Sequence, residues 1–153
     1  MNVSLEAPYH VGIVVPDLDV AMASYSEVLD VDWASVQDLT VDLCDQGGCT
    51  TTPVRITYSC AGPTYLELIE AVPGTVWTAS DEVHHVGVWT GDVDARSREL
   101  DALGYPAVAW AAGREGGRAW FAYHRVPNLG LVELVDQRSQ PAFERWVAGG
   151  EYR

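Results

Sequence analysis

The order of apolar and polar positions divides the chain into two halves of the same design. Residues 10–15 form a nearly continuous apolar run after a histidine, which predicts a short buried strand, and residues 20–29 carry apolar side chains at helical spacing. Further extended segments are predicted at 31–36, near 39–43, at 54–59 and at 65–69. The second half repeats this order, with a strand at 85–89, a helix over about 95–103, and strands at 107–111, 118–123 and 131–135. Each half therefore predicts one strand, one helix and about three more strands.

Turn-forming residues separate these elements. Asp17 and Asp92 stand 75 positions apart (92 − 17 = 75) just before the two predicted helices, where an aspartate is typical of an N-cap. The first half is longer, and we place its extra residues in a polar loop at 37–52. Residues 73–81 read as the linker between the halves, and a short C-terminal helix is expected at 141–147.

The repeat includes residues that carry chemistry. The run His10-Val-Gly-Ile recurs at His85-Val-Gly-Val (85 − 10 = 75), and Leu-Glu67-Leu recurs as Val-Glu133-Leu (133 − 67 = 66). Apolar strands that bury histidine and glutamate must supply partners for those polar groups. If the halves pair about a pseudo-twofold axis, the four side chains converge, and two imidazoles with two carboxylates suit Zn, Ni, Co, Fe or Mn. The glycines at 12 and 87 leave room beside the histidines.

Each of these residues taken alone is more often structural, and only the matched set of four favours a metal site. His84 alternates to the opposite face from His85, which indicates a surface or packing residue, and a turn role is expected for His124.

Composition narrows the range of partners. The net charge is −13, lysine is absent and all nine basic residues are arginine, which disfavours nucleic acid and anionic membrane surfaces. No apolar run reaches the length of a transmembrane helix, and residues 1–9 lack the features of a signal peptide, so a cytoplasmic protein is expected. Cys44 and Cys49 could form a disulfide, but three reduced thiols, with Cys60, are favoured for a cytoplasmic protein.

The four motifs, over residues 8–137, resemble the vicinal oxygen chelate superfamily, also called the glyoxalase, bleomycin-resistance and dioxygenase superfamily. The resemblance implies an α+β fold in one domain, residues 1–153, with tandem βαβββ modules at 8–72 and 82–137 and a C-terminal helix or tail at 138–153. The modules would form an open, cupped sheet around a metal ion, and a homodimer is expected.

Within that superfamily the chain is most similar to glyoxalase I and methylmalonyl-CoA epimerase. Glu67 follows the glyoxalase I pattern, because epimerases usually carry glutamine there. Epimerases also carry a second catalytic glutamate between the helix and the third strand, where this chain offers only Asp38, Asp42 and Asp45.

The expected chemistry is that of a metal-dependent lyase, isomerase or epimerase acting through an enolate or enediolate of a carbonyl substrate, such as a thioester. Glu133 is predicted as the base, and Glu67 as a second acid/base or a metal ligand only, with His10 and His85 completing the ligand set. Side chains expected to bind the small-molecule substrate are Val14, Tyr65, Ile69, Trp89 and Leu131 from the same strand faces, and Arg114 and Arg118 from a glycine-rich turn. Two alternatives remain open: an iron-dependent dioxygenase, and a metal-free protein of the bleomycin-resistance type that sequesters its ligand.

Overall fold

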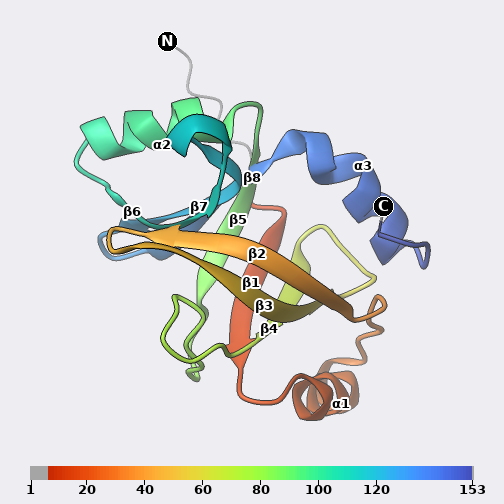
Figure 1. The fold of residues 1–153 in the computed structure, drawn as a ribbon. Coiled ribbons are helices and arrows are strands. Elements are labelled where there is room, and N and C mark those ends of the chain that lie inside the picture. The colour runs from red at the N-terminus through yellow and green to blue at the C-terminus, as the bar shows by residue number, and fades with distance from the viewer. Residues whose placement is uncertain (1–6, 153) are drawn as a thin grey trace.

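A computed structural model describes residues 7–152. The first half contains β1 (His10–Val15), α1 (Leu18–Leu29), β2 (Gln37–Asp45), β3 (Gly48–Tyr58) and β4 (Tyr65–Glu70). The second half contains β5 (His85–Thr90), α2 (Val93–Ala102), β6 (Ala107–Ala112), β7 (Arg118–Val126) and β8 (Gly130–Asp136). The remaining elements of residues 7–152 are two short 3₁₀ turns, η1 (Arg114–Gly116) and η2 (Gln137–Ser139), and the helix α3 (Gln140–Val147) (Figure 1). The predicted α+β fold with two βαβββ modules is confirmed.

All eight strands belong to one mixed sheet in the order β1-β4-β3-β2-β6-β7-β8-β5. In each half the first and last strands are parallel neighbours, β1 with β4 and β5 with β8, and the two modules meet where β1 and β5 pair antiparallel. The sheet also closes on its far side, because Leu43 pairs with Ala111 and Cys44 with Trp110 across β2 and β6. The cupped sheet expected from the family resemblance is therefore closed on this side rather than open, through these two residue pairs.

The helices α1 and α2 lie outside the sheet, near opposite ends of the molecule in Figure 1. Both predicted N-caps are confirmed: the side chain of Asp17 accepts a hydrogen bond from Val20 N, and that of Asp92 accepts one from Ala95 N. The predicted C-terminal helix at 141–147 is present as α3, which packs Phe143 and Trp146 into an aromatic cluster beside the sheet.

Two predicted segments differ from the structure. Residues 31–36 make only an isolated bridge, from Trp33 to Ser59, because this segment is anchored to helices: Trp33 Nε1 donates to Met22 O, and Trp146 Nε1 donates to Ser35 O. Residues 37–52 are not a polar loop but most of the β2–β3 hairpin. Their polar side chains alternate with buried ones such as Val41 and Leu43, so one face of the hairpin is buried and the other is exposed to solvent.

Cysteine chemistry also departs from expectation. Cys44 and Cys49 are direct cross-strand neighbours in the β2–β3 hairpin and are joined by a disulfide, while Cys60 is a free thiol. The expectation of three reduced thiols was wrong because hairpin register brings the first two cysteines face to face. Within residues 7–152, the structure has no helix that is both long and apolar enough to span a bilayer. The interpretation of residues 1–9 as lacking a signal peptide concerns positions that fall largely outside the described residues.

Candidate metal centre

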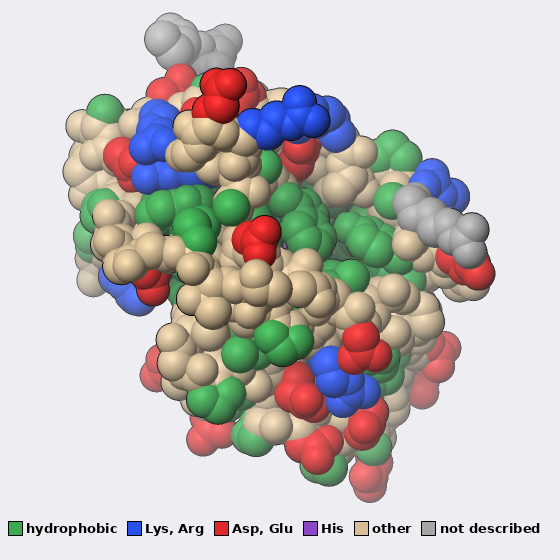
Figure 2. Space-filling view, viewed as in Figure 1, with side chains coloured by type: hydrophobic (Ala, Val, Ile, Leu, Met, Phe, Trp, Pro, Cys, Tyr) green, Lys and Arg blue, Asp and Glu red, His purple; other side chains and the backbone are tan. Residues whose placement is uncertain are grey.

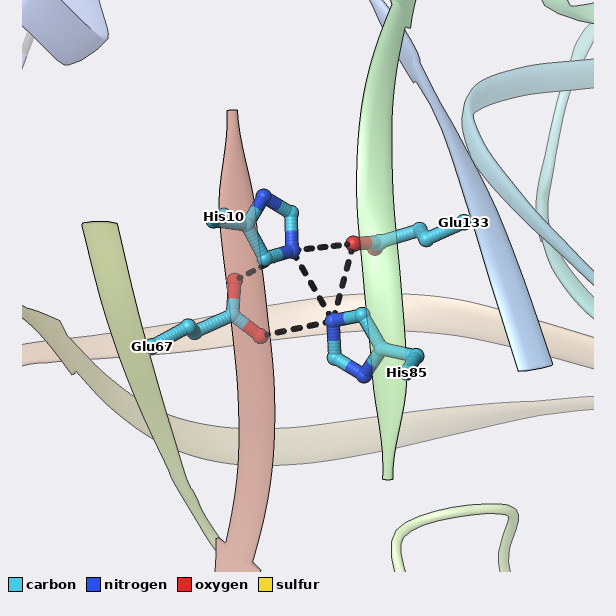
Figure 3. Close-up of side chains that lie close together, drawn as sticks. All are labelled: His10, Glu67, His85 and Glu133. Carbon is cyan, nitrogen blue, oxygen red and sulfur yellow. Dashed lines mark hydrogen bonds and ion pairs between the residues drawn. The ribbon is translucent and has the colours of Figure 1, made fainter. Parts of the chain in front are cut away.

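The strand register brings His10, Glu67, His85 and Glu133 together inside the sheet (Figure 3). They come from β1, β4, β5 and β8, the four adjacent strands around the junction of the two modules. Across β1 and β5, each histidine pairs with the glycine of the other half. Across the parallel pairs, Gly12 lies opposite Glu67, and Gly87 lies opposite Glu133. The two halves therefore place their histidine, glycine and glutamate in the same strand register.

The ligand-type atoms of these four buried side chains form one compact group. The Nε2 atoms of His10 and His85 are 2.9 Å apart, and Glu133 Oε2 lies 3.0 Å from the first and 3.2 Å from the second. Glu67 is slightly further away, with Oε2 3.6 Å from His10 Nε2 and Oε1 3.4 Å from His85 Nε2. One ligand atom from each residue lies within 4.8 Å of all the others.

This group fits a divalent metal ion. Glu67 Oε1 and Glu133 Oε2 are buried, and neither accepts a hydrogen bond of good geometry from any part of the chain that the structure describes. Buried carboxylate oxygens are costly to leave without a partner, and both face imidazole nitrogens across the same small space. Two imidazoles and two carboxylates are ligands that Zn, Mn, Fe, Co and Ni accept. The sequence prediction that these four residues converge is therefore matched by their positions.

Gly12 and Gly87 each leave space for the histidine of the opposite half. A Cβ atom on Gly12 would lie 1.9 Å from Cε1 of His85, and a Cβ atom on Gly87 would lie 1.9 Å from Cε1 of His10. Any side chain at either position would occupy the volume of an imidazole ring. Each half therefore supplies a histidine and also the space for the other half's histidine.

In the metal-free cluster, electrostatics favour the charged forms of His85 and Glu133. Burial alone would lower the pKa of His85, but the nearby carboxylates of Glu133 and Glu67 outweigh burial and raise this pKa to about 10. Burial would raise the pKa of Glu133, but His85 and His10 hold it well below its usual range. His85 and Glu133 are thus a charged, mutually stabilised pair, and a divalent cation could enter the cluster as His85 releases its proton.

Two tyrosines that were not predicted stand behind the carboxylates. Tyr58 on β3 pairs in register with Glu67 and donates a hydrogen bond from its hydroxyl to Glu67 Oε2, and Tyr123 on β7 pairs with Glu133. Burial, with the charges of Glu133 and Glu67, raises the pKa of Tyr123 well above its usual value, so its hydroxyl stays protonated. The sequence carries a signal for them, because these tyrosines are 65 positions apart (123 − 58 = 65) and the glutamates 66, but a repeated tyrosine alone does not indicate a role at a metal site.

His84 has a different place from the one expected. Its Nδ1 atom lies 2.8 Å from Nδ1 of His85, and its Nε2 atom lies 2.7 Å from the carbonyl oxygen of Val76 in the linker. His84 is therefore in direct contact with a candidate ligand, contrary to the prediction of a residue on the opposite face. Strand alternation does not apply to it, because β5 begins at His85.

A cavity of about 70 Å³ adjoins the cluster, and Glu67 and Glu133 are the charged residues in its wall. The rest of the wall is largely aromatic and includes Tyr9, Tyr58, Trp77, Trp89, Trp120, Phe121, Tyr123, Phe143, Trp146 and Tyr152. Figure 2 shows hydrophobic side chains gathered in a hollow beside α3 on the face viewed there. Since Ser139, Phe143, Trp146 and Tyr152 all lie in the C-terminal segment, the unrepeated end of the chain closes one side of this cavity.

The predicted substrate-binding residues divide into two groups. Ile69 and Trp89 line the cavity, whereas Val14, Tyr65 and Leu131 lie in the surrounding packing. The two arginines lie elsewhere. Arg114 is exposed in η1, and Arg118 is buried beneath α2.

Arg118 belongs to a buried polar network that the sequence reading missed. Its Nη1 atom donates to Ser97 Oγ at 2.6 Å and pairs with Asp101 at 2.8 Å, and its guanidinium lies over the ring of Trp110. His124, expected in a turn, is fully buried on β7, with Nε2 2.7 Å from Ser97 Oγ. This network attaches α2 to the sheet, so Arg118 is engaged away from the cavity.

The three aspartates of β2 do not approach the cluster either. Asp38, Asp42 and Asp45 are all exposed; Asp38 pairs with Arg55, and Asp42 accepts a hydrogen bond from Thr51. None of them belongs to the cluster or to the wall of the adjoining cavity.

Comparisons with known proteins agree with this architecture. A model of the glyoxalase/bleomycin resistance protein/dioxygenase superfamily matches residues 9–123, while no curated protein sequence matches the chain. A variant of methylmalonyl-CoA epimerase from Streptomyces coelicolor, in complex with 2-nitronate-propionyl-CoA, is similar with a TM-score of 0.58 and 23% identity, over 87% of this chain and 98% of that one.

Two further solved structures show the same fold. Methylmalonyl-CoA epimerase from Mycobacterium tuberculosis has a TM-score of 0.59 and 21% identity, over 94% of this chain and 96% of that one. A hypothetical protein from Bacillus halodurans has a TM-score of 0.53 and 20% identity, over 86% of this chain and 94% of that one.

Proposed function

Since the chain belongs to the glyoxalase/bleomycin resistance protein/dioxygenase superfamily, we propose that it is a divalent-metal-dependent isomerase, epimerase or lyase that moves a proton beside a substrate carbonyl. One observation carries this proposal: the two carboxylates of the metal cluster are also the charged groups in the wall of the adjoining cavity. The same two residues can therefore face both a metal ion and a substrate.

His10, Glu67, His85 and Glu133 would hold the metal. When bound, a divalent cation polarises a carbonyl group and makes the neighbouring C–H bond more acidic. Glu133 is the proposed base: the C–H bond breaks, the proton passes to a Glu133 carboxylate oxygen, and the electron pair moves to the carbonyl oxygen.

Glu67 is the proposed partner acid. It lies in the other half of the site, and the Tyr58 hydroxyl fixes its position. Return of a proton to the opposite face of the same carbon gives epimerisation, and return to the neighbouring carbon gives isomerisation. Neither outcome needs an oxidant or a reductant.

The cavity wall supports a compact, largely apolar substrate. Its lining, as far as the structure describes it, contains no lysine or arginine, and the chain carries a net charge of −13. Phosphate groups are usually bound by arginine, lysine or helix N-termini. Although two similar structures are methylmalonyl-CoA epimerases, we propose a substrate without a phosphate-bearing carrier, such as an arylated or alkylated carbonyl compound.

Metal analysis of protein purified without chelator tests the proposal. We expect about one equivalent of Zn, Ni, Co, Mn or Fe, lost in Glu67→Gln and Glu133→Gln, and retained in the matched control Glu99→Gln, whose side chain pairs with Arg96 on the surface of α2. Deuterium wash-in from D₂O beside the carbonyl, measured over a panel of small carbonyl compounds and thioesters, then tests proton transfer.

Other results would favour the alternatives. Iron with O₂ uptake would indicate a dioxygenase. Failure to bind any of these metals would contradict the proposal and leave the aromatic cavity as the site of a sequestering protein.

A further inference from the structure

We propose that His84 is a positioning residue that fixes the tautomer and orientation of His85, so that Nε2 of His85 is the nitrogen presented to the metal. The inference deepens the proposed function and rests on it for its metal-binding consequence, whereas the hydrogen-bond arrangement itself can be tested without metal. It concerns three consecutive groups in space: the Val76 carbonyl, the His84 ring and the His85 ring.

The Val76 carbonyl oxygen decides which atom donates and which accepts in each of these hydrogen bonds. A carbonyl oxygen can only accept, so His84 Nε2, 2.7 Å from Val76 O, must carry the proton and donate. In neutral imidazole the other nitrogen is then an acceptor, so His84 Nδ1 accepts. His85 Nδ1, 2.8 Å away, must therefore be the donor. With its Nδ1 proton committed, the only nitrogen of His85 that can offer a lone pair to a metal is Nε2.

That nitrogen is the one which faces the cluster. His85 Nε2 lies 3.2 Å from Glu133 Oε2 and 3.4 Å from Glu67 Oε1 (Figure 3). The His84 contact also limits rotation of the ring, because turning His85 would break the bond at Nδ1. Hydrogen bonds from a metal-bound histidine to a second residue commonly set both tautomer and orientation.

The other half of the site lacks this device. His10 Nδ1 is buried and has no hydrogen-bond partner among residues 7–152. Its ring is held by packing, edge-on to Tyr9 with centroids 4.4 Å apart and edge-on to Tyr58 at 5.5 Å. The residue before His10 is Tyr9, whereas the residue before His85 is His84, so the repeated motif differs at the position that provides the support.

The linker supplies the anchor for this support. Val76 holds His84, and the next residue, Trp77, donates from Nε1 to the hydroxyl of Tyr123, which is the tyrosine paired with Glu133. Backbone bonds between Val72 and Trp77 and between Thr75 and Val72 keep the linker in a tight turn. Two neighbouring linker residues therefore brace the histidine and the glutamate of the second half.

Three variants separate positioning from packing. In His84→Asn, the amide oxygen can take the place of Nδ1 and accept from His85. In His84→Gln, the amide reaches toward Val76 but leaves His85 without its acceptor. In His84→Leu, both bonds are lost while an apolar side chain fills the space. We expect the affinity for Zn or Co, measured by titration of chelator-treated protein, to fall about 10- to 100-fold in His84→Leu and His84→Gln and to stay within a few fold in His84→Asn.

Nitrogen-15 NMR of the histidine side chains in metal-free wild type provides a readout independent of metal binding. His84 should show a protonated Nε2 and an unprotonated Nδ1, and a nitrogen–nitrogen coupling across the hydrogen bond should join Nδ1 of His85 to Nδ1 of His84 in wild type and be absent in His84→Leu. The proposal is overturned if His84 carries its proton on Nδ1, or if His84→Leu binds metal as tightly as wild type. If wild type binds no metal while the NMR pattern is as expected, the proposed function fails and the tautomer assignment stands.

Discussion

The two halves of the site contain the same ligands but support them differently. In the first half, His10 is held by ring packing and Glu67 by the Tyr58 hydroxyl, both from within its own module. In the second half, His85 is tied by hydrogen bonds through His84 to the linker, which also contacts Tyr123. The repeat therefore carries the ligands of both halves, while in the second half the unrepeated linker supplies part of their support.

The largest expected difference between the halves is in the stability cost of replacing Gly12 or Gly87 by alanine. Gly12→Ala drives a methyl group into the His85 ring, which His84 prevents from turning, whereas Gly87→Ala meets His10, whose Nδ1 has no such restraint. We expect Gly12→Ala to lower the free energy of unfolding by about 3 kcal/mol and Gly87→Ala by clearly less, in urea titrations.

A control isolates the clash. In a His85→Ala background the ring is gone, so adding Gly12→Ala should cost little further stability. Equal losses for the two glycine variants, or a full loss for Gly12→Ala in the His85→Ala background, would contradict the account of unequal support.

The two glutamates should also differ in their effect on His85. Glu133 Oε2 is closer to His85 Nε2 than either oxygen of Glu67 and contributes more to the raised pKa of about 10. In metal-free protein, we expect the pKa of His85 to fall toward its ordinary range in both variants, and to fall further in Glu133→Gln than in Glu67→Gln, by NMR titration. Glu99→Gln should leave it unchanged.

The raised pKa of His85 also determines how its contribution to stability changes with pH. Because the folded-state pKa of His85 is raised, its contribution is fully present below the ordinary histidine pKa of about 6.5 and is lost as pH rises toward about 10. A larger fall in the pKa of His85 in Glu67→Gln than in Glu133→Gln would contradict the stronger influence expected of Glu133.

The smallest expected effect concerns the two helices. α1 packs through apolar contacts around Leu18, whereas α2 rests on the polar network of Ser97, Arg118 and His124. Burial lowers the pKa of His124, so below about pH 6.5 the unfolded chain binds a proton that the folded protein resists, and stability falls by at most about 1.4 kcal/mol per pH unit.

Acid should therefore loosen α2 before α1. We expect amide hydrogen exchange in α2 to accelerate between pH 6.5 and 5 relative to α1, after correction for the intrinsic pH dependence of exchange. The pH slope of stability should be shallower in His124→Gln. An equal response of the two helices would indicate that His124 does not govern the attachment of α2.

Much of the fold and the four ligands could be predicted because they depend on local patterns. Alternation on short strands places His10 and Glu67 inward, and the repetition at His85 and Glu133 makes a coincidence improbable. The closure of the sheet could not be predicted, because it depends on how far the β2–β3 hairpin reaches toward β6. The disulfide was missed for the same reason, since it follows from hairpin register.

The supports of the site were harder to infer than its ligands. His84 was assigned by alternation to the wrong environment, because its contact with Val76 depends on the path of the linker. Arg118 beside a glycine-rich turn is typical of a solvated tip, but its partner Asp101 comes from the preceding helix. Such contacts join segments whose relative positions no local pattern specifies.

The reciprocal glycine contacts have a consequence for the history of the chain. Gly12 and His85 share one volume, and Gly87 and His10 share another, so each residue is constrained by its counterpart in the other half rather than by its neighbour in sequence. A single ancestral module pairing with its own copy would have met the same condition at both places. After duplication the two halves could diverge widely elsewhere, yet these positions could change only in crosswise pairs, and relatives that have lost one histidine should be those in which the opposite glycine has been released.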